Sequence, residues 1–312
     1  MKLPSNGLIT ILGPTACGKT RFAAMLADKV DGVIISADSR QVYKRMSIGT
    51  GKDYDDYIVD GRKIDVRLID IVEPGEKYNL FRFQNDFLRE YNNIIISGKI
   101  PLLCGGTGLY IDAIVRSYKL LPVPPNYKLR AELEKKTLKE LESILASYKK
   151  LHNKTDTDTK KRAIRAIEIE EYYRTHPFEK PIIPDLKVLN IGIIYEREEI
   201  RKRIKERLLK RLQNGMIEEV QNLINEGLTY DDLIYYGLEY KHIAYYLMGK
   251  VDYETMVEKL YVAICQFAKR QMTWFRKMER EGIKINWLRG EEGMEYNLNK
   301  AIEMINNFFI YK

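Results

Sequence analysis

The sequence predicts an α/β fold, a parallel sheet flanked by helices, with an inserted all-helical domain. Three observations predict it. Short apolar runs alternate with helical patterns, which favours a parallel sheet with helices on both faces. The first run is followed at once by GPTACGKT, the pattern of a phosphate-binding loop. The alternation then stops over residues 119–186. Together these features indicate a P-loop NTPase-like core with an insertion.

The predicted sheet has six strands. They are expected at residues 8–12, 32–36, 65–71, 101–104, 188–195 and 283–288. Most of these segments read as continuous apolar runs rather than as an alternation, which is typical of strands buried on both faces.

Two proline-rich stretches delimit the insertion, since proline punctuates regular structure. The stretch LLPVPP opens it and HPFEKPIIPD closes it. Between them, residues 128–151 and 159–174 read as charged helices. We therefore expect a core domain made of residues 1–118 and 187–312, and a helical domain made of residues 119–186.

Two long helices are expected after the fifth strand. In residues 198–224 an apolar residue recurs every fourth position, which predicts one buried stripe. In residues 255–280 helical spacing places Lys269, Thr273 and Arg276 on one face. The buried face of that helix is expected to contain Val257, Leu260, Ile264, Phe267 and Phe275.

Composition bounds the class of protein. The 312 residues are 45% hydrophobic and 31% charged, which is typical of a folded globular chain. We expect no membrane-spanning segment, because no apolar run is long enough. We also expect no signal peptide, because no apolar stretch precedes residue 8. The protein is therefore expected to be a cytoplasmic monomer. The net charge of +8 indicates a polyanionic partner. The three cysteines and three histidines match no metal spacing or disulfide framework.

The phosphate loop predicts a site for a diphosphate-bearing ligand. Gly13 and Gly18 permit the tight path that turns successive N–H groups inward at a helix N-terminus. Lys19 would reach the terminal phosphate and the Thr20 hydroxyl would hold Mg²⁺. The loop comprises Gly13, Pro14, Thr15, Ala16, Cys17, Gly18, Lys19 and Thr20. Cys17 is interpreted as a small filler residue.

The loop alone leaves three classes of function open. A kinase of a nucleotide or small metabolite would need a carboxylate after a second apolar strand, and Asp70 in VRLID could serve. A non-catalytic RNA-binding protein could use the loop as a structural anion site. Asp38 follows the second strand, at the edge where open α/β sheets bind ligands, so it is either a general base or a cap of the next turn.

Six motifs, in one order and spacing, narrow these alternatives. They are GPTACGKT, ADSRQVYKRMSIGTGK, LIDIVEP, PLLCGGTGLYIDAI, KKRAIRAIEI and AKRQMTWFRK. As a set they resemble the tRNA dimethylallyltransferase family over nearly the whole chain. No Cys or His follows Cys265, so the resemblance is to the bacterial type, which lacks a C-terminal zinc finger.

The resemblance implies a different use of the phosphate loop. The family transfers a dimethylallyl group from dimethylallyl diphosphate to N6 of the adenosine just 3′ of the tRNA anticodon, adenosine-37, and diphosphate leaves. By resemblance, Asp38 is the base at N6, Thr107 contacts the substrate near the reacting amine, and Arg203 joins Lys19 on the diphosphate. An exocyclic adenine amine is a poor nucleophile, so a base that takes its proton helps.

The resemblance also implies contacts with the tRNA anticodon stem-loop. These lie in the stretch after the second strand, in the insertion and in the last long helix. The residues are Asp38, Ser39, Arg40, Gln41, Thr107, Arg130, Lys161, Arg162, Ala163, Ile164, Arg165, Lys269, Arg270, Gln271, Thr273, Trp274 and Arg276. One stretch departs from the family pattern: after Gly237, Leu238 and Glu239 stand where an aromatic and a basic residue are expected.

Overall fold

The computed structural model describes residues 3–148, 157–176 and 183–309. Contacts divide the chain into two compact units, one made of residues 1–117 with 183–312 and the other of residues 118–182. Ile183 belongs to the first unit because its side chain is buried in that unit's core. The return to the core therefore begins four residues before the predicted position 187.

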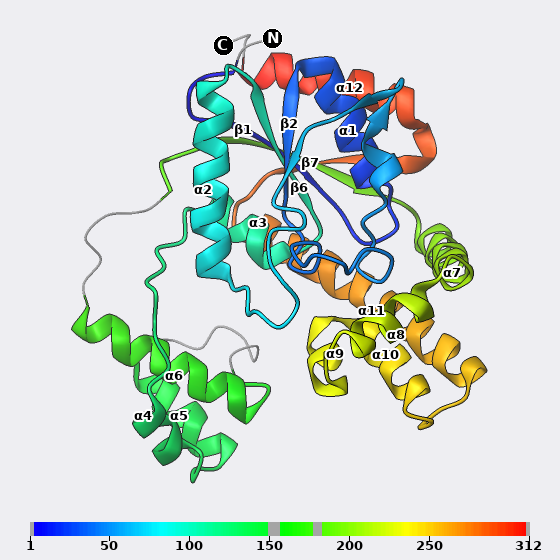
Figure 1. Cartoon of the computed structure of the whole chain (residues 1–312). Helices are drawn as coiled ribbons and strands as arrows, with labels where there is room; N and C mark the ends of the chain where they lie inside the picture. Colours follow the sequence, from blue (N-terminus) through cyan, green and yellow to red (C-terminus); the bar gives the residue numbers. More distant parts are fainter. Residues whose placement is uncertain (1–2, 149–156, 177–182, 310–312) are drawn as a thin grey trace. The chain divides into compact units, whose positions relative to one another are not determined.

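A six-stranded sheet forms the centre of the first unit (Figure 1). Its order is β5-β2-β6-β1-β7-β8, and every pairing is parallel. The strands are β1 (Gly7–Leu12), β2 (Gly32–Ser36), β5 (Val66–Arg67), β6 (Ile100–Gly105), β7 (Lys187–Ile194) and β8 (Ile285–Arg289). The parallel α/β prediction is confirmed, and all six predicted strands are present.

The edge strand β5 is much shorter than the predicted residues 65–71. Leu68 and Asp70 have positive φ values of 62° and 55°, which takes the backbone out of the extended region after Arg67. A small antiparallel pair, β3 (Ile58–Val59) and β4 (Arg62–Lys63), follows the short 3₁₀ helix η1 (Tyr54–Tyr57).

Helices cover both faces of the sheet (Figure 1). The side chains of β1 alternate between the two faces, because Leu8 and Leu12 enter one buried cluster and Ile9 and Ile11 the other. One face is covered by α1 (Lys19–Val30) and α12 (Met294–Phe309), which follows the 3₁₀ helix η2 (Gly290–Glu292). The other is covered by α2 (Leu80–Ile96), α3 (Gly108–Val115) and α11 (Tyr253–Arg280).

The predicted helix over residues 198–224 is two helices, α7 (Arg197–Gln213) and α8 (Met216–Asn225). Gly215 separates them with φ +92°, a conformation that favours glycine and does not continue a helix. The short helices α9 (Tyr230–Tyr236) and α10 (Leu238–Leu247) follow.

On α11 the predicted buried face is right except at one position. Leu260, Ile264 and Phe275 are buried, and Val257 packs at the edge of the core, whereas Phe267 is exposed. Ala268 occupies the place expected for Phe267, because the buried stripe advances by four residues at this turn.

The second unit contains α4 (Tyr127–Leu133), α5 (Leu138–Tyr148) and α6 (Lys160–Thr175) around its own small core. The predicted helix over residues 128–151 is interrupted between α4 and α5. Thr137 and Glu140 bond reciprocally to each other's backbone N–H, a capping box that starts a new helix. Among the described residues, no helix has the length and apolar character needed to cross a membrane.

Candidate active site around the phosphate loop

Four connections meet at the carboxyl edge of the sheet. The phosphate loop follows β1, Asp38 follows β2, Thr107 follows β6 and α7 follows β7. These strands are neighbours in the sheet and run in the same direction, so their C-terminal ends bring the four segments together. This edge is where ligands bind in open α/β sheets.

The phosphate loop has the backbone that its glycines predict. Gly18 has φ +78° and leads directly into α1. A Cβ atom on Gly13 would lie 2.5 Å from the carbonyl oxygen of Ile193 and 2.8 Å from Cys17 Sγ, so no side chain fits there. The Thr15 N–H donates to Gln271 Oε1 at 2.8 Å. The loop is therefore fixed by β7 on one side and by α11 on the other.

The structure gives the surroundings of two loop side chains, Lys19 and Cys17. Lys19 Nζ donates to the Pro14 carbonyl at 3.2 Å, which folds the lysine back over the loop. Cys17 is buried, in agreement with its interpretation as a filler residue. The neighbouring Cys104 is also buried, and burial raises the pKa of its thiol to about 12, so it stays protonated.

Arginines of α7 line the loop from outside. Arg203 Nε donates to the Ala16 carbonyl at 3.0 Å, and its guanidinium lies 4.5 Å from the Tyr195 ring centroid. One turn later, Arg207 Nη1 lies 3.3 Å from Thr15 Oγ1. Two guanidinium groups therefore flank the loop, where the sequence predicted Arg203 alone.

Asp53 holds Arg207 and a third arginine in place. Its Oδ2 accepts from Arg207 Nη2 at 2.7 Å and from Arg211 Nη2 at 3.3 Å. Burial opposes ionisation of Asp53, but the two guanidinium charges outweigh it and hold its pKa below the ordinary value. Gly51 has φ +75°, a conformation that favours glycine, and a Cβ atom there would lie 2.2 Å from Arg211 Nη2, so the guanidinium would have to move.

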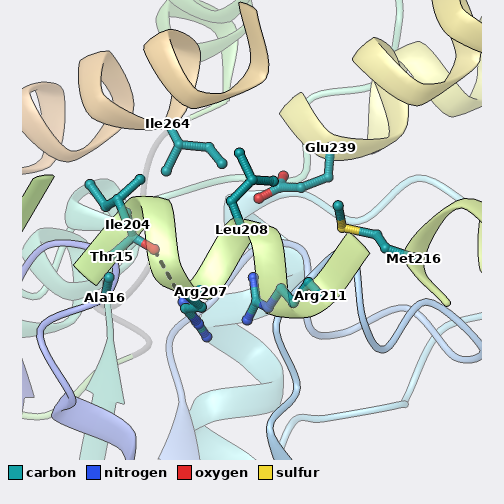
Figure 2. A pocket seen from close by; sticks show the side chains of 9 residues that line it. All are labelled: Thr15, Ala16, Ile204, Arg207, Leu208, Arg211, Met216, Glu239 and Ile264. Atoms are coloured by element: carbon teal, nitrogen blue, oxygen red, sulfur yellow. Dashed lines mark hydrogen bonds between the residues drawn. The ribbon is translucent and has the colours of Figure 1, made fainter. Parts of the chain in front are cut away.

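A pocket opens between the phosphate loop and α7 (Figure 2). Its wall is apolar at Ile204, Leu208 and Ile264 and charged at one end. The remaining lining residues are Thr15, Ala16, Arg207, Arg211, Met216 and Glu239.

Glu239, which departs from the family pattern, is the acidic residue of this lining. Burial raises its pKa above the ordinary value, and the nearby Arg211 and Arg207 counteract that rise. Arg211 Nε is buried without a hydrogen-bond partner among the described residues.

Asp38 lies beside Thr107 at the ends of two neighbouring strands. Asp38 Oδ1 accepts from the Arg40 N–H at 2.8 Å, so the carboxylate does cap the turn that follows it. The Thr107 hydroxyl accepts from the Ser39 N–H at 3.1 Å and makes no cap bond to α3, although Thr107 occupies the N-cap position. The strand ends approach closely because Gly105 has no side chain; a Cβ atom there would lie 2.3 Å from the Ala37 carbonyl oxygen.

Arg40 and Gln41, both predicted RNA contacts, have different surroundings. The Arg40 guanidinium lies 5.3 Å from the ring centroid of Tyr235 on α9. Gln41 is buried, and its Nε2 donates to the Gly51 carbonyl at 2.9 Å. The Gln41 side chain thus joins two loops of the site.

On α11 the predicted contacts divide between the surface and the interior. Lys269, Arg270, Thr273 and Arg276 are exposed. Gln271 is 6% exposed, and besides accepting from Thr15 it donates to the Gly106 carbonyl at 2.8 Å. Trp274 packs against Gly108, and its Nε1 is buried without a partner among the described residues.

In the second unit, Lys161 and Arg162 are exposed, whereas Ala163 and Ile164 lie in the core. Glu168, whose side chain is 1% exposed, organises the two remaining predicted contacts. It bonds to both Arg130 and Arg165, at 2.8–2.9 Å in the case of Arg130. These bonds outweigh burial and lower the pKa of Glu168 to about 2.

Asp70, the carboxylate that a kinase would use, is paired with other side chains. Its Oδ1 accepts from Lys52 Nζ at 2.5 Å, and its Oδ2 accepts from the Tyr54 hydroxyl. The Lys52 side chain is fully buried, so this pair closes the edge of the sheet.

His176 stacks on Tyr172 and His242 is partly buried, while His152 lies outside the described residues. Over residues 3–148, 157–176 and 183–309, no group of three or more His, Cys, Asp or Glu could hold a metal ion. A Mg²⁺ ion held mainly by substrate phosphates and water needs only one or two protein ligands, so such a cluster is not required for it.

Sequence reasoning missed the parts of the site that depend on distant contacts. Arg207, Asp53 and Arg211 are not among the site residues that the sequence predicted. The four-residue spacing of Arg203, Arg207 and Arg211 on one helix face was the available signal. Nothing local to Gln271 indicates its bond to the phosphate loop, 256 residues earlier.

Two family models match the chain. The model described as IPP transferase matches residues 41–278, and the model described as isopentenyl transferase matches residues 6–73. Among curated relatives, a tRNA dimethylallyltransferase 2 of Bacteroides fragilis is 54% identical over 308 residues, which cover 99% of this chain and 100% of the relative. A tRNA dimethylallyltransferase 2 of Treponema denticola is 49% identical over 90% of this chain and 95% of its own length.

Solved structures agree with these matches. The full-length tRNA isopentenylpyrophosphate transferase of Bacillus halodurans superposes with a TM-score of 0.71 at 28% identity, covering 97% of this chain and 96% of that one. A eukaryotic dimethylallyltransferase acting on tRNA gives a TM-score of 0.76 at 21% identity, covering 97% and 79%. The second likeness is one of fold.

Proposed function

The chain belongs to the tRNA dimethylallyltransferase family, a family of prenyltransferases, and we propose that it transfers the dimethylallyl group of dimethylallyl diphosphate to N6 of adenosine-37 of tRNA. The observation that carries the proposal is the meeting of the phosphate loop with Asp38 and Thr107 at one edge of the sheet. The enzyme acts as a cytoplasmic monomer in this proposal.

The phosphate loop and the α7 arginines hold the diphosphate of the donor. Lys19, Arg203 and Arg207 converge on the loop, and their positive charge stabilises the negative charge that develops on the leaving diphosphate. Mg²⁺ at the Thr20 hydroxyl would add to this neutralisation. The C–O bond of the allylic carbon breaks and diphosphate leaves, so no phosphoryl group is transferred.

Asp38 takes the proton from the attacking amine. The exocyclic N6 forms the new C–N bond, and one of its hydrogens passes to the free carboxylate oxygen of Asp38, while Oδ1 remains on the Arg40 N–H. Thr107, fixed against Ser39, lies next to Asp38 and orients the amine. The adenine reaches this edge only if it leaves the stack of the anticodon loop.

The exposed basic residues bind the anticodon stem-loop in this proposal. Lys269, Arg270, Thr273 and Arg276 form its α11 surface, and Lys161 and Arg162 act from the second unit. Because Ala163 and Ile164 are buried, their side chains position α6 rather than touch RNA.

The test is nucleoside analysis of unmodified tRNA incubated with the protein, Mg²⁺ and dimethylallyl diphosphate. We expect N6-dimethylallyladenosine and released diphosphate, strongly reduced by Lys19→Ala. Replacing the donor by ATP should yield neither a modified nucleoside nor a phosphorylated product. Phosphate transfer from ATP without any prenylation would instead favour the kinase alternative, which the pairing of Asp70 with Lys52 disfavours.

A further inference from the structure

We propose that Tyr235, together with Arg40, forms a stacking platform for an unpaired base of the anticodon loop that neighbours the extruded adenosine. The inference rests on the proposed function and extends its RNA contacts to Tyr235, a residue outside the predicted set. Three observations support the inference. The Tyr235 side chain is exposed, its ring is held by buried aromatic side chains, and it lies near Asp38.

Tyr235 presents a large aromatic surface to solvent. Its side chain is 45% exposed at the end of α9, although the adjacent Tyr236 is buried. The Arg40 guanidinium lies over the Tyr235 ring at 5.3 Å from its centroid. Single-stranded RNA loops are bound by stacking their unpaired bases on aromatic rings and guanidinium planes.

The Tyr235 ring packs against buried aromatic side chains. Tyr235 meets Tyr236 edge to face with centroids 5.4 Å apart, and Tyr236 meets Tyr43 in the same way at 4.8 Å. The Gly75 N–H donates to the Tyr236 hydroxyl. A ring held this way loses little conformational entropy when a base stacks on it, which favours binding.

The platform lies next to the reacting group. Asp38 Oδ1 is bonded to the backbone N–H of Arg40, the residue whose side chain covers Tyr235. A nucleotide adjacent in sequence to the adenosine at Asp38 is therefore within reach of the platform.

The experiment uses an anticodon stem-loop hairpin with 2-aminopurine placed in turn on either side of the accepting adenosine. With the wild-type protein we expect quenching at one of the two positions. Tyr235→Phe should keep the quenching and the hairpin Kd. Tyr235→Leu keeps the apolar bulk without the π face, and should lose the quenching and raise Kd about 5- to 150-fold, the range for one stacked base.

Tyr296 provides the matched control. It is 53% exposed on α12 and has Lys300 at 5.0 Å over its ring, so it is a second cation–aromatic pair on another part of the unit. Tyr296→Leu should leave quenching and Kd unchanged. An effect of Tyr296→Leu equal to that of Tyr235→Leu would overturn the proposal.

Failure of the inference is distinct from failure of the proposed function. If the wild-type protein prenylates the hairpin while Tyr235→Leu has the wild-type Kd and quenching, the platform is wrong and the function stands. If the wild-type protein forms no prenylated product, the function itself fails. Should Tyr235→Leu not fold, Tyr235→Trp replaces it, and unchanged emission of the new tryptophan on hairpin binding contradicts the platform.

Discussion

Asp38 caps the turn that follows it and, in the proposed function, takes the proton from the amine; one substitution separates the two roles. The amide oxygen of Asn can still accept from the Arg40 N–H and keep the turn, but Asn cannot take a proton from the amine. Asp38→Asn should therefore lower kcat by about 10²- to 10⁴-fold, the range for general base catalysis, with little change in donor KM.

The measurement is single-turnover transfer at saturating donor and tRNA, with thermal unfolding as a check on the turn. Asp38→Ala, which loses both roles, should also lower the unfolding temperature. A wild-type rate for Asp38→Asn would show that Asp38 only caps the turn and is not the general base.

Gln271 bonds to the Thr15 N–H of the phosphate loop and to the Gly106 carbonyl, and these contacts indicate its role. Gln271→Leu leaves the Thr15 N–H and the Gly106 carbonyl unpaired, which should cost about 1–3 kcal/mol of stability for each buried group. The phosphate loop loses its support from α11, so donor KM should rise while the Kd for tRNA stays the same.

Steady-state kinetics and tRNA binding measure the two effects separately. The exposed neighbour Gln266 supplies the control, and Gln266→Leu should change neither. A weakened tRNA Kd with wild-type donor KM would show that Gln271 contacts RNA directly, as the resemblance alone implied.

The helices α4 and α6 are joined by the carboxylate of Glu168. The folded pKa of Glu168 is about 2, below the ordinary value of 4.5, so its stabilisation is fully present above about pH 4.5 and is lost as the pH falls toward 2. The shift corresponds to on the order of 3 kcal/mol. We expect the second unit to unfold in acid, and Glu168→Gln to destabilise it already at pH 7.

Hydrogen exchange of residues 127–133 and 160–175 between pH 7 and pH 3 measures this, after correction for the intrinsic exchange rate. Glu132→Gln, at an exposed position of α4, is the control and should behave as the wild type. Equal protection in Glu168→Gln and the wild type at pH 7 would contradict the stabilising role of the cluster.

Across the whole molecule, the net charge of +8 should affect tRNA binding through those basic side chains that are exposed and contact the RNA. Lys269→Ala and Arg276→Ala should each weaken tRNA binding and reduce the slope of log Kd against log salt by about 0.7–0.9 per phosphate contact. Donor KM should stay unchanged.

Fluorescence anisotropy over a salt series gives the slopes. Lys300→Ala on α12 is the matched loss of one positive charge and should alter neither slope nor affinity. If all three variants behave alike, Lys269 and Arg276 belong to a solvated helix face.

The parallel α/β fold, the phosphate loop and the helical insertion could be predicted from the sequence, because they follow from local periodicity, glycine spacing and proline. The sequence also placed Asp38 and Thr107 at strand ends, where parallel strands must deliver them to one edge. Strand length at residues 65–71 and the breaks at Gly215 and Thr137 were beyond it, since they depend on single backbone conformations and caps.

The polar residues that support the site could be identified only from the folded chain. Gln271 reaches the phosphate loop across 256 residues, and Asp53 joins two arginines of α7 across more than 150. The tertiary structure also divided the predicted RNA contacts into exposed side chains and buried ones such as Gln41 and Ile164. Local patterns cannot predict such pairings, because a hydrogen bond between distant segments exists only once the chain has packed around its core.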